Sequence, residues 1–529
     1  MRLAPLGRLA CASTPRRNQL VVIGFYLLAA VAAYEVATNI ITDDMTSQWY
    51  LLLAVVGGVV VIKILNSWRT GLYFFLGWLL FEDLARKFLG NNMVIYFAKD
   101  ALALVVLISF LTAYRRREVS SFRPPFRLPL LLFFWFGVLQ VFNFASPHLA
   151  FGFLGLKLYY FYIPLMFVGY SLLQSESDLR RFFFANLILA DVIASLGVVQ
   201  GVLGHTFLNP AVPAAELKAL STLYRTAPIS GVLLYRPTSV FVSDGRFGSY
   251  LILSMLLAFG FAGYLLLRSR QGRLFAFLSV AIIGVSIVLS GSRGVLMWSA
   301  GSILVGSVAF LWGAPWKQGE PLRVLRTIQR TALVGGLALL VFFYFNPDAL
   351  LSRVAFYTET LSLNSPKSEL IYRMFEYPWQ NFAAAFDSPR WLYGYGIGTA
   401  SLGTQYVWLF FRVASPAGGV ENGYGTLILE FGVLGLVLWI VMSVAICRSC
   451  WKVARTLKGS PWFPLGFMLF WFAFLLLIPF TFNGMVSYQN FVLNAYLWLL
   501  IGVLFRVPGI ALATELQPGQ VEQKIGWTT

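Results

Sequence analysis

The sequence has few of the side chains on which soluble proteins and metalloenzymes depend. Only 12% of its 529 residues are charged, and it has two histidines, His148 and His205, and three cysteines. Two histidines argue against a histidine-based metal centre or catalytic triad. Cys447 and Cys450 form a single CxxC, whereas zinc would need a second pair or neighbouring histidines. With Cys11 the only other cysteine, we expect neither a disulfide framework nor a metal site.

Motifs for nucleotide binding are missing as well. The chain has no Walker loop and no Asp-x-Asp pair that would hold a nucleotide sugar through a metal ion. The run Gly394-Tyr395-Gly396-Ile397-Gly398 looks superficially like a dinucleotide fingerprint, but it neither follows a strand nor opens a Rossmann helix. We expect a loop that packs closely over a substrate, or else a set of turn glycines. The sequence therefore predicts no cofactor.

What the chain has in abundance is apolar sequence. Hydrophobic residues make up 58% of it, and apolar runs of about 20 residues, each long enough to cross a bilayer as a helix, recur along the whole length. The short alternating segments of a membrane barrel are absent. The pattern predicts an all-α, polytopic integral membrane helical bundle with about 14 transmembrane helices, roughly at 19–41, 48–66, 70–90, 93–114, 127–146, 150–173, 181–203, 239–267, 274–290, 294–313, 331–346, 421–446, 463–482 and 487–505.

The net charge of +18 follows the membrane topology. Basic loops fall on one side of the predicted spans, as cytoplasmic loops do, so we expect no nucleic-acid partner. The apolar run 20–41 is longer than a signal-peptide core and is interpreted as a retained first helix. The span 70–90 is the least regular, because Glu82, Asp83, Arg86 and Lys87 crowd its end, and we expect it to be partly interfacial.

Four regions follow from this topology: N-terminal transmembrane helices (1–203), central transmembrane helices with arginine motifs (204–346), a periplasmic loop subdomain (347–420), and C-terminal transmembrane helices with a cytoplasmic tail (421–529). The long loop is rich in aromatic residues, which predicts an ordered cap with helical pieces, partly lying on the membrane.

Two arginine motifs are predicted on the outer side. Arg236 and Arg246 flank a Thr-Ser-Val-Phe stretch, and Arg293 stands in the Ser-Gly-Ser-Arg-Gly turn between two apolar runs. Arginine offers a planar fork of donors that suits phosphate or carboxylate. Each could instead be an interfacial anchor, and Arg246 could pair with Asp244.

An acidic motif opens the span at 421. Glu421, Asn422 and Tyr424 stand at its outer end, where Glu421 could act as a general base or could only complement the helix dipole. Glu430, more than two turns deeper, is expected to be a structural, hydrogen-bonded acid. Arg373 and Trp379 in the long loop are further candidates for substrate binding.

The order and spacing of these motifs resemble the O-antigen polymerase and O-antigen ligase superfamily, most strongly from about 236 to 435. Arg236 with its Thr-Ser-Val-Phe segment is similar to the family's first arginine motif, and the motif around Arg293 to its second. Arg373, Trp379 and the run 394–398 resemble its loop pattern. The segment from Glu421 to Gly435 matches the helix that closes the loop. The resemblance implies a GT-C-type glycosyltransferase in a bacterial inner (cytoplasmic) membrane, with its active site facing the periplasm.

The resemblance also implies roles and partners. Arg236 and Arg293 would hold the diphosphate of a polyprenyl-diphosphate-linked oligosaccharide, Glu421 would activate the acceptor hydroxyl, and Arg373 with the loop aromatics would hold sugars. Membrane lipids and a chain-length regulator would be further partners. Ligases of the family carry His where this chain has Glu421, which favours polymerisation of repeat units. Ligation of glycan to lipid A core or protein, and outside enzymes a polysaccharide or lipid transporter, stay open.

Overall fold

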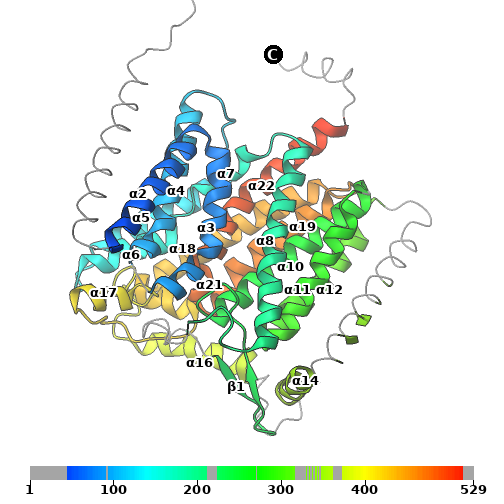
Figure 1. The fold of residues 1–529 in the computed structure, drawn as a ribbon. Helices are drawn as coiled ribbons and strands as arrows, with labels where there is room; N and C mark the ends of the chain where they lie inside the picture. The colour runs from blue at the N-terminus through cyan, green and yellow to red at the C-terminus, as the bar shows by residue number, and fades with distance from the viewer. Residues whose placement is uncertain are drawn as a thin grey trace, which may run out of the picture. The chain divides into compact units, whose positions relative to one another are not determined.

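A computed structural model describes residues 45–90, 93–210, 223–269, 271–315, 347–361 and 372–515, with isolated positions between 329 and 344. These residues are mostly helical (Figure 1). The expected span 19–41 lies outside the described residues, as does most of 331–346. The chain divides into two compact units at residue 71, and the first contributes α2 (Met45–Asn66).

Within the described residues, eight helical segments are long and apolar enough to cross a membrane. They are α4 (Met93–Arg115), α6 (Leu149–Tyr160) continuing into α7 (Leu165–Leu172), α8 (Glu176–Leu203), α10 (Asp244–Arg268), α12 (Arg293–Gly313), α18 (Gly423–Thr456), α19 (Phe463–Leu475) with its extension to Asn483, and α22 (Phe491–Glu515).

Shorter apolar helices occupy other expected spans. They are α5 (Arg127–Val141), α11 (Arg273–Leu289) and the part of α2 from Val56 to Asn66. The expectation of an all-α, multi-pass membrane protein is confirmed at this level. The count of about 14 spans stays a prediction.

The second unit is built around α10, which packs against α8, α11, α12 and α19. Helix α10 is apolar around its circumference, which is the pattern of a helix that neighbours cover on all sides. Helices α7 and α22 approach even more closely. A Cβ added to Gly169 would lie 2.1 Å from the carbonyl oxygen of Leu499. Small residues allow such contacts between membrane helices.

Helix α3 (Trp68–Leu89) differs from the expectation for 70–90. It is too highly charged to count among the eight segments. The four charged side chains at its end are buried within the protein: Glu82, Asp83 and Arg86 are at most 1% exposed, and Lys87 is 8% exposed. The physical reason is pairing, because each of these groups has polar partners inside the protein.

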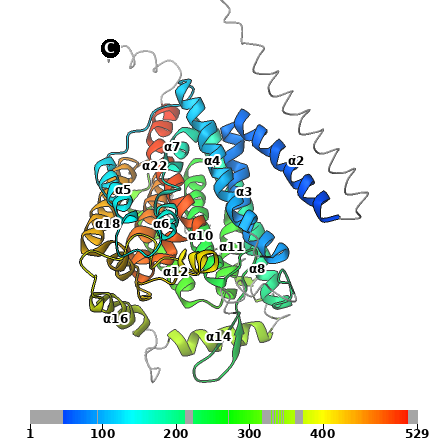
Figure 2. The ribbon, with the colours of Figure 1, turned by 90° about the vertical axis from the view of Figure 1, so that its left-hand side faces the viewer.

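The hairpin and the helices of the long loop gather at one end of the bundle (Figures 1 and 2). Strands β1 (Tyr224–Thr226) and β2 (Leu233–Tyr235) form an antiparallel hairpin in which Tyr224 pairs with Tyr235. The long loop contributes α14 (Pro347–Leu361), η1 (Tyr372–Glu376), α16 (Tyr377–Ala384), η2 (Ala385–Asp387) and α17 (Thr404–Phe411). Helical pieces are therefore present in the described part of this loop. Short helices α20 (Thr481–Asn483) and α21 (Met485–Gln489) lie between α19 and α22.

Candidate functional site

Arg236 lies directly after β2, at the start of the loop that leads into α10. Its backbone N–H donates to the carbonyl of Leu223 at 2.8 Å, which extends the hairpin by one rung. The side chain is 6% exposed and forms an ion pair with Asp244 in the first turn of α10. An acidic residue is favourable at this position of a helix, so Asp244 is held by the dipole of α10 and in turn fixes the guanidinium.

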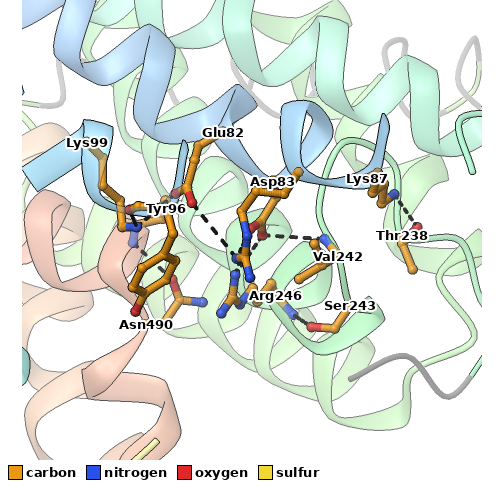
Figure 3. A network of polar contacts seen from close by, with 12 residues as sticks. Glu82, Asp83, Lys87, Tyr96, Lys99, Thr238, Val242, Ser243, Arg246 and Asn490 are labelled. Carbon is orange, nitrogen blue, oxygen red and sulfur yellow. Dashed lines mark hydrogen bonds and ion pairs between the residues drawn. The ribbon is translucent and has the colours of Figure 1, made fainter. Parts of the chain in front are cut away.

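Arg246, two residues further along α10, points toward Asp83 on α3 (Figure 3). Its Nη1 lies 2.8 Å from both carboxylate oxygens of Asp83 on α3. The alternative pairing of Arg246 with Asp244 is therefore wrong, because Asp244 forms its ion pair with Arg236. A carboxylate 163 residues away in sequence takes that place, which no local pattern could show.

Arg293 is the first residue of α12 and follows a tight turn from α11. Gly291 in this turn has φ +62°, and a Cβ there would lie 2.5 Å from Leu234 Cδ2 and 3.4 Å from Arg236 Cγ. The turn therefore packs directly on β2. The two arginine motifs, which are more than 50 residues apart in the sequence, thus meet at the hairpin.

Helix α14 holds the hairpin and the end of α11 together. The sequence analysis did not single out this helix. Arg353 donates to the carbonyls of Leu289 at 3.1 Å and Tyr235 at 3.4 Å, so it bridges α11 and β2. One turn later, the hydroxyl of Tyr357 donates to the carbonyl of Val288 at 3.1 Å. Burial raises the pKa of Tyr357 to about 12. The four-residue spacing of Arg353 and Tyr357 is the one signal that could have placed them on a common helical face.

A fourth arginine joins the hairpin. Desolvation lowers the pKa of Arg225 on β1, and the positive charges of Arg236, Arg293 and Arg373 lower it further, while Asp244 opposes the shift. In the hairpin register Arg225 lies opposite Leu234, the residue on which the Gly291 turn packs. The predicted residue Arg236 and the turn before Arg293 thus meet at the hairpin. Arg225 is an addition that the sequence analysis missed.

The acidic motif at the start of α18 lies against α16. Asn422 caps α18: its side chain accepts from the N–H of Gly425 at 2.9 Å and donates to the carbonyl of Pro378 at 3.0 Å. The N–H of Glu421 donates to the side chain of Asn381 at 3.2 Å. These bonds hold the start of α18 against α16. Asn422 is 1% exposed and acts as a cap, whereas the side chain of Glu421 is exposed.

Arg373 links this motif to the arginines. Its guanidinium lies over the ring of Tyr377, 4.7 Å from the centroid. Hydrogen bonding with the Glu421 carboxylate raises the pKa of Tyr377, and the charge of Arg373 opposes this. Arg373 therefore lies beside the Tyr377–Glu421 pair, and its charge also contributes to the lowered pKa of Arg225. The site combines four cations with an exposed carboxylate.

Trp379 and Tyr424 share one aromatic neighbour that sequence reasoning missed. Both rings meet Phe482 on α20 edge to face, at centroid distances of 5.5 and 5.3 Å. Trp379 remains 59% exposed. An exposed indole in a cluster of rings gives a flat apolar surface beside Glu421, of the kind that stacks on sugar rings.

The glycine run 394–398 packs on protein backbone. The N–H groups of Tyr395 and Gly396 donate to the carbonyls of Leu429 and Glu430 at 2.7 and 3.0 Å, where α18 is kinked at Gly432 with φ +74°. A Cβ on Gly394 would lie 2.5 Å from the carbonyl oxygen of Glu430. The close approach is therefore to α18, which agrees with structural glycines.

Glu430, two residues before the kink at Gly432, is fully buried. Its carboxylate accepts from the hydroxyl of Tyr159 at 2.8 Å, the N–H of Ala400 at 3.0 Å, and the hydroxyl of Ser401. The expectation of a structural, hydrogen-bonded acid agrees with these contacts.

No protein-family model matches the chain, and no match is found among curated proteins.

Proposed function

We propose that the protein is an inner-membrane glycosyltransferase that polymerises polyprenyl-diphosphate-linked oligosaccharide repeat units at the periplasmic face. The observation that carries this proposal is that Arg225, Arg236 and the turn before Arg293 meet at the hairpin. Arg373 lies over the ring of Tyr377, whose pKa Glu421 raises by hydrogen bonding. Arginine forks suit a diphosphate, and an exposed carboxylate beside them suits the activation of a hydroxyl.

In the proposed reaction, Glu421 takes the proton of an acceptor sugar hydroxyl. The hydroxyl oxygen attacks the anomeric carbon of the donor, and the bond from that carbon to the lipid diphosphate breaks. The arginines stabilise the negative charge that develops on the departing diphosphate. Direct attack in line with the leaving group inverts the anomeric carbon. Trp379 supplies a surface for the sugars.

One of the arginines is oriented by protein groups before any substrate is bound. Asp244 and the hairpin orient Arg236, and the turn at Gly291, two residues before Arg293, packs on the same strand. Such preorganisation supports catalysis, because donors already aimed at the leaving group need no reorganisation during the reaction.

The decisive experiment uses purified protein and lipid-linked oligosaccharide as the sole substrate. Longer lipid-linked products without an added acceptor support a polymerase. Products that form only after addition of lipid A core or an acceptor protein would make the enzyme a ligase. Absence of product in both reactions, from protein of normal thermal stability, would refute the glycosyltransferase assignment.

A transporter of lipid-linked glycan is the rival from another class. The buried charges of α3 and α4 favour it, because intramembrane ionisable residues often mark transport pathways. Transfer of labelled lipid across sealed proteoliposomes, with no glycan extension, would establish this rival.

A further inference from the structure

A small basic cavity lies between α4, α6, α10 and α22, outside the residues assigned to the reaction above. Three cationic side chains line it, from Lys99, Lys157 and Arg246. The cavity offers about 40 Å³ to the centre of a water-sized sphere. That is room for about three waters, and therefore for one small anionic group.

Each of the three cations has a carboxylate partner. Lys99 Nζ lies 3.1 Å from Glu82, Lys157 Nζ lies 2.6 Å from Asp100, and Arg246 pairs with Asp83 at 2.8 Å. These three pairs join residues of α3, α4, α6 and α10. Figure 3 shows Asp83 of α3 facing Arg246.

Positive charge nevertheless exceeds negative charge in this cluster. Among the described residues, the cluster contains three carboxylates and five basic side chains: Glu82, Asp83 and Asp100, against Arg86, Lys87, Lys99, Lys157 and Arg246. Leaving buried charge uncompensated costs several kcal/mol per ion. A bound anion would remove much of this cost, and the cavity is where the cations leave room for one.

The aromatic rings that line the cavity also leave its cations able to attract an anion. The ring of Tyr96 has Lys99 Nζ at 3.6 Å and Lys157 Nζ at 4.7 Å from its centroid. Arg246 stands 4.9 Å from the ring centroid of Phe491. Rings hold cations in place without neutralising them, so the cations keep their attraction for an anion.

An apolar surface borders the cavity. Gln405 and Tyr406, at the start of α17, line it. The next residues of α17 expose large rings, with Trp408 at 51%, Phe410 at 55% and Phe411 at 51%. A basic pocket beside an exposed aromatic surface matches a molecule whose anionic head is attached to an apolar chain.

We propose that this cavity binds the phosphate head of a second polyprenyl-diphosphate-linked molecule, the acceptor unit. The proposal rests on the proposed function, because polymerisation consumes two lipid-linked units and the arginine cluster serves only the donor. The first turn of α10 joins the two sites: Asp244 pairs with Arg236 of the donor site, and Arg246 lines the cavity.

The test counts bound lipid by native mass spectrometry of the full chain in nanodiscs of zwitterionic lipid. The probe is polyprenyl diphosphate without sugar. Wild-type protein is expected to bind two equivalents. Lys157→Gln should lose one, and Arg293→Ala should lose the other. An unchanged count of two for Lys157→Gln would overturn the proposal.

A second pair of variants avoids disturbing the buried ion pairs. Gln405 is exposed at the cavity. Gln405→Glu places a like charge beside the anion and should weaken binding at this site about tenfold, whereas Gln405→Leu, the matched control, should leave it within about twofold. Equal affinity for the two variants would contradict the proposal.

Competing probes identify the source of the phosphate. Phosphatidylglycerol that displaces the lipid from the cavity at equal concentration would make this a general anionic-lipid site, and inorganic phosphate that does so would show that the lipid chain is irrelevant. Either result overturns the acceptor assignment. Polymer formation is scored separately: if no polymer forms while Lys157→Gln still loses one equivalent, the proposed function fails but the lipid-phosphate site stands.

Discussion

Arginine side chains supply the positive charge of the proposed donor site, and their partners differ. Asp244 holds Arg236 in a buried ion pair, while Arg225 is close to other cations. A diphosphate placed among them would relieve this repulsion. The geometry of each guanidinium should therefore matter as much as its charge.

Arg293→Lys is expected to be nearly as damaging as Arg293→Ala, because a point charge does not replace a bidentate fork on a diphosphate. Polymer length and initial rate from purified protein measure this. Arg268→Lys is the matched control, since Arg268 pairs with Glu176 at 3.3 Å and is 36% exposed. Polymer of wild-type length from a normally expressed Arg293→Lys protein would return Arg293 to the role of an interfacial anchor.

Glu421→Gln tests the proposed base. The amide keeps the size of the side chain but cannot accept the proton, so the rate should fall by about 10²–10⁴-fold, while donor binding persists. Single-turnover rates and lipid binding are measured in parallel. Glu118→Gln, an exposed acid paired with Arg116, is the control. A normal rate for Glu421→Gln would leave this carboxylate as a helix-terminal charge.

Among the structural elements, the hairpin depends on α14. The Glu359 carboxylate accepts from the N–H of Ile229 at 2.8 Å and of Ser230 at 3.1 Å. Hydrogen bonds from Ser230 and Ile229 lower the pKa of Glu359 from its ordinary 4.5. A lowered pKa in the folded state means that the stabilisation is present above about pH 4.5 and is lost as the pH falls through the folded value.

Glu359→Gln should therefore loosen the hairpin tip at neutral pH. Faster hydrogen exchange of the Ile229 and Ser230 amides measures the effect, with α10 amides unchanged as the internal control. The difference between variant and wild type should shrink as the pH is lowered below about 4.5. Equal exchange at pH 7 would show that α14 does not hold the turn through this carboxylate.

The kink of α18 gives a second prediction. Gly432 has φ +74°, and a Cβ there would lie 2.1 Å from the carbonyl oxygen of Leu392. Gly432→Ala should destabilise the protein by about 1–3 kcal/mol and disturb the bonds from Tyr395 and Gly396. Gly301→Ala, in an open helical position, is the control. Thermal unfolding in detergent reports both, and equal melting temperatures would contradict this view of the kink.

Across the whole molecule, the prediction concerns sidedness. The hairpin, α14 and α16 gather at one end (Figures 1 and 2), and the basic loops predict that the opposite end is cytoplasmic. In a background without Cys11, Cys447 and Cys450, a cysteine at Ser292 or Ala414 should react with an impermeant thiol reagent in intact spheroplasts. A cysteine at Glu118 should react only after lysis. The reverse pattern would invert the topology.

The sequence alone indicated the all-α membrane character of the chain. Hydropathy and charge act locally, so a run of about 20 apolar residues is enough to indicate a helix that can cross a bilayer. Local chemistry also indicated the residues to examine. Arg236, Arg293 and Glu421 each stand where a charged or glycine-bordered segment interrupts apolar sequence.

Only the tertiary structure decided which of these groups are partners. Arg246 pairs with Asp83 across 163 residues, and Lys87 donates to the hydroxyl of Thr238 across 151. Whether a charge is buried depends on which helices pack around it, and local pattern carries no information about a partner so far away. That is why the partners of the charged end of α3, Arg225 and the basic cavity emerged only once the helices were in place.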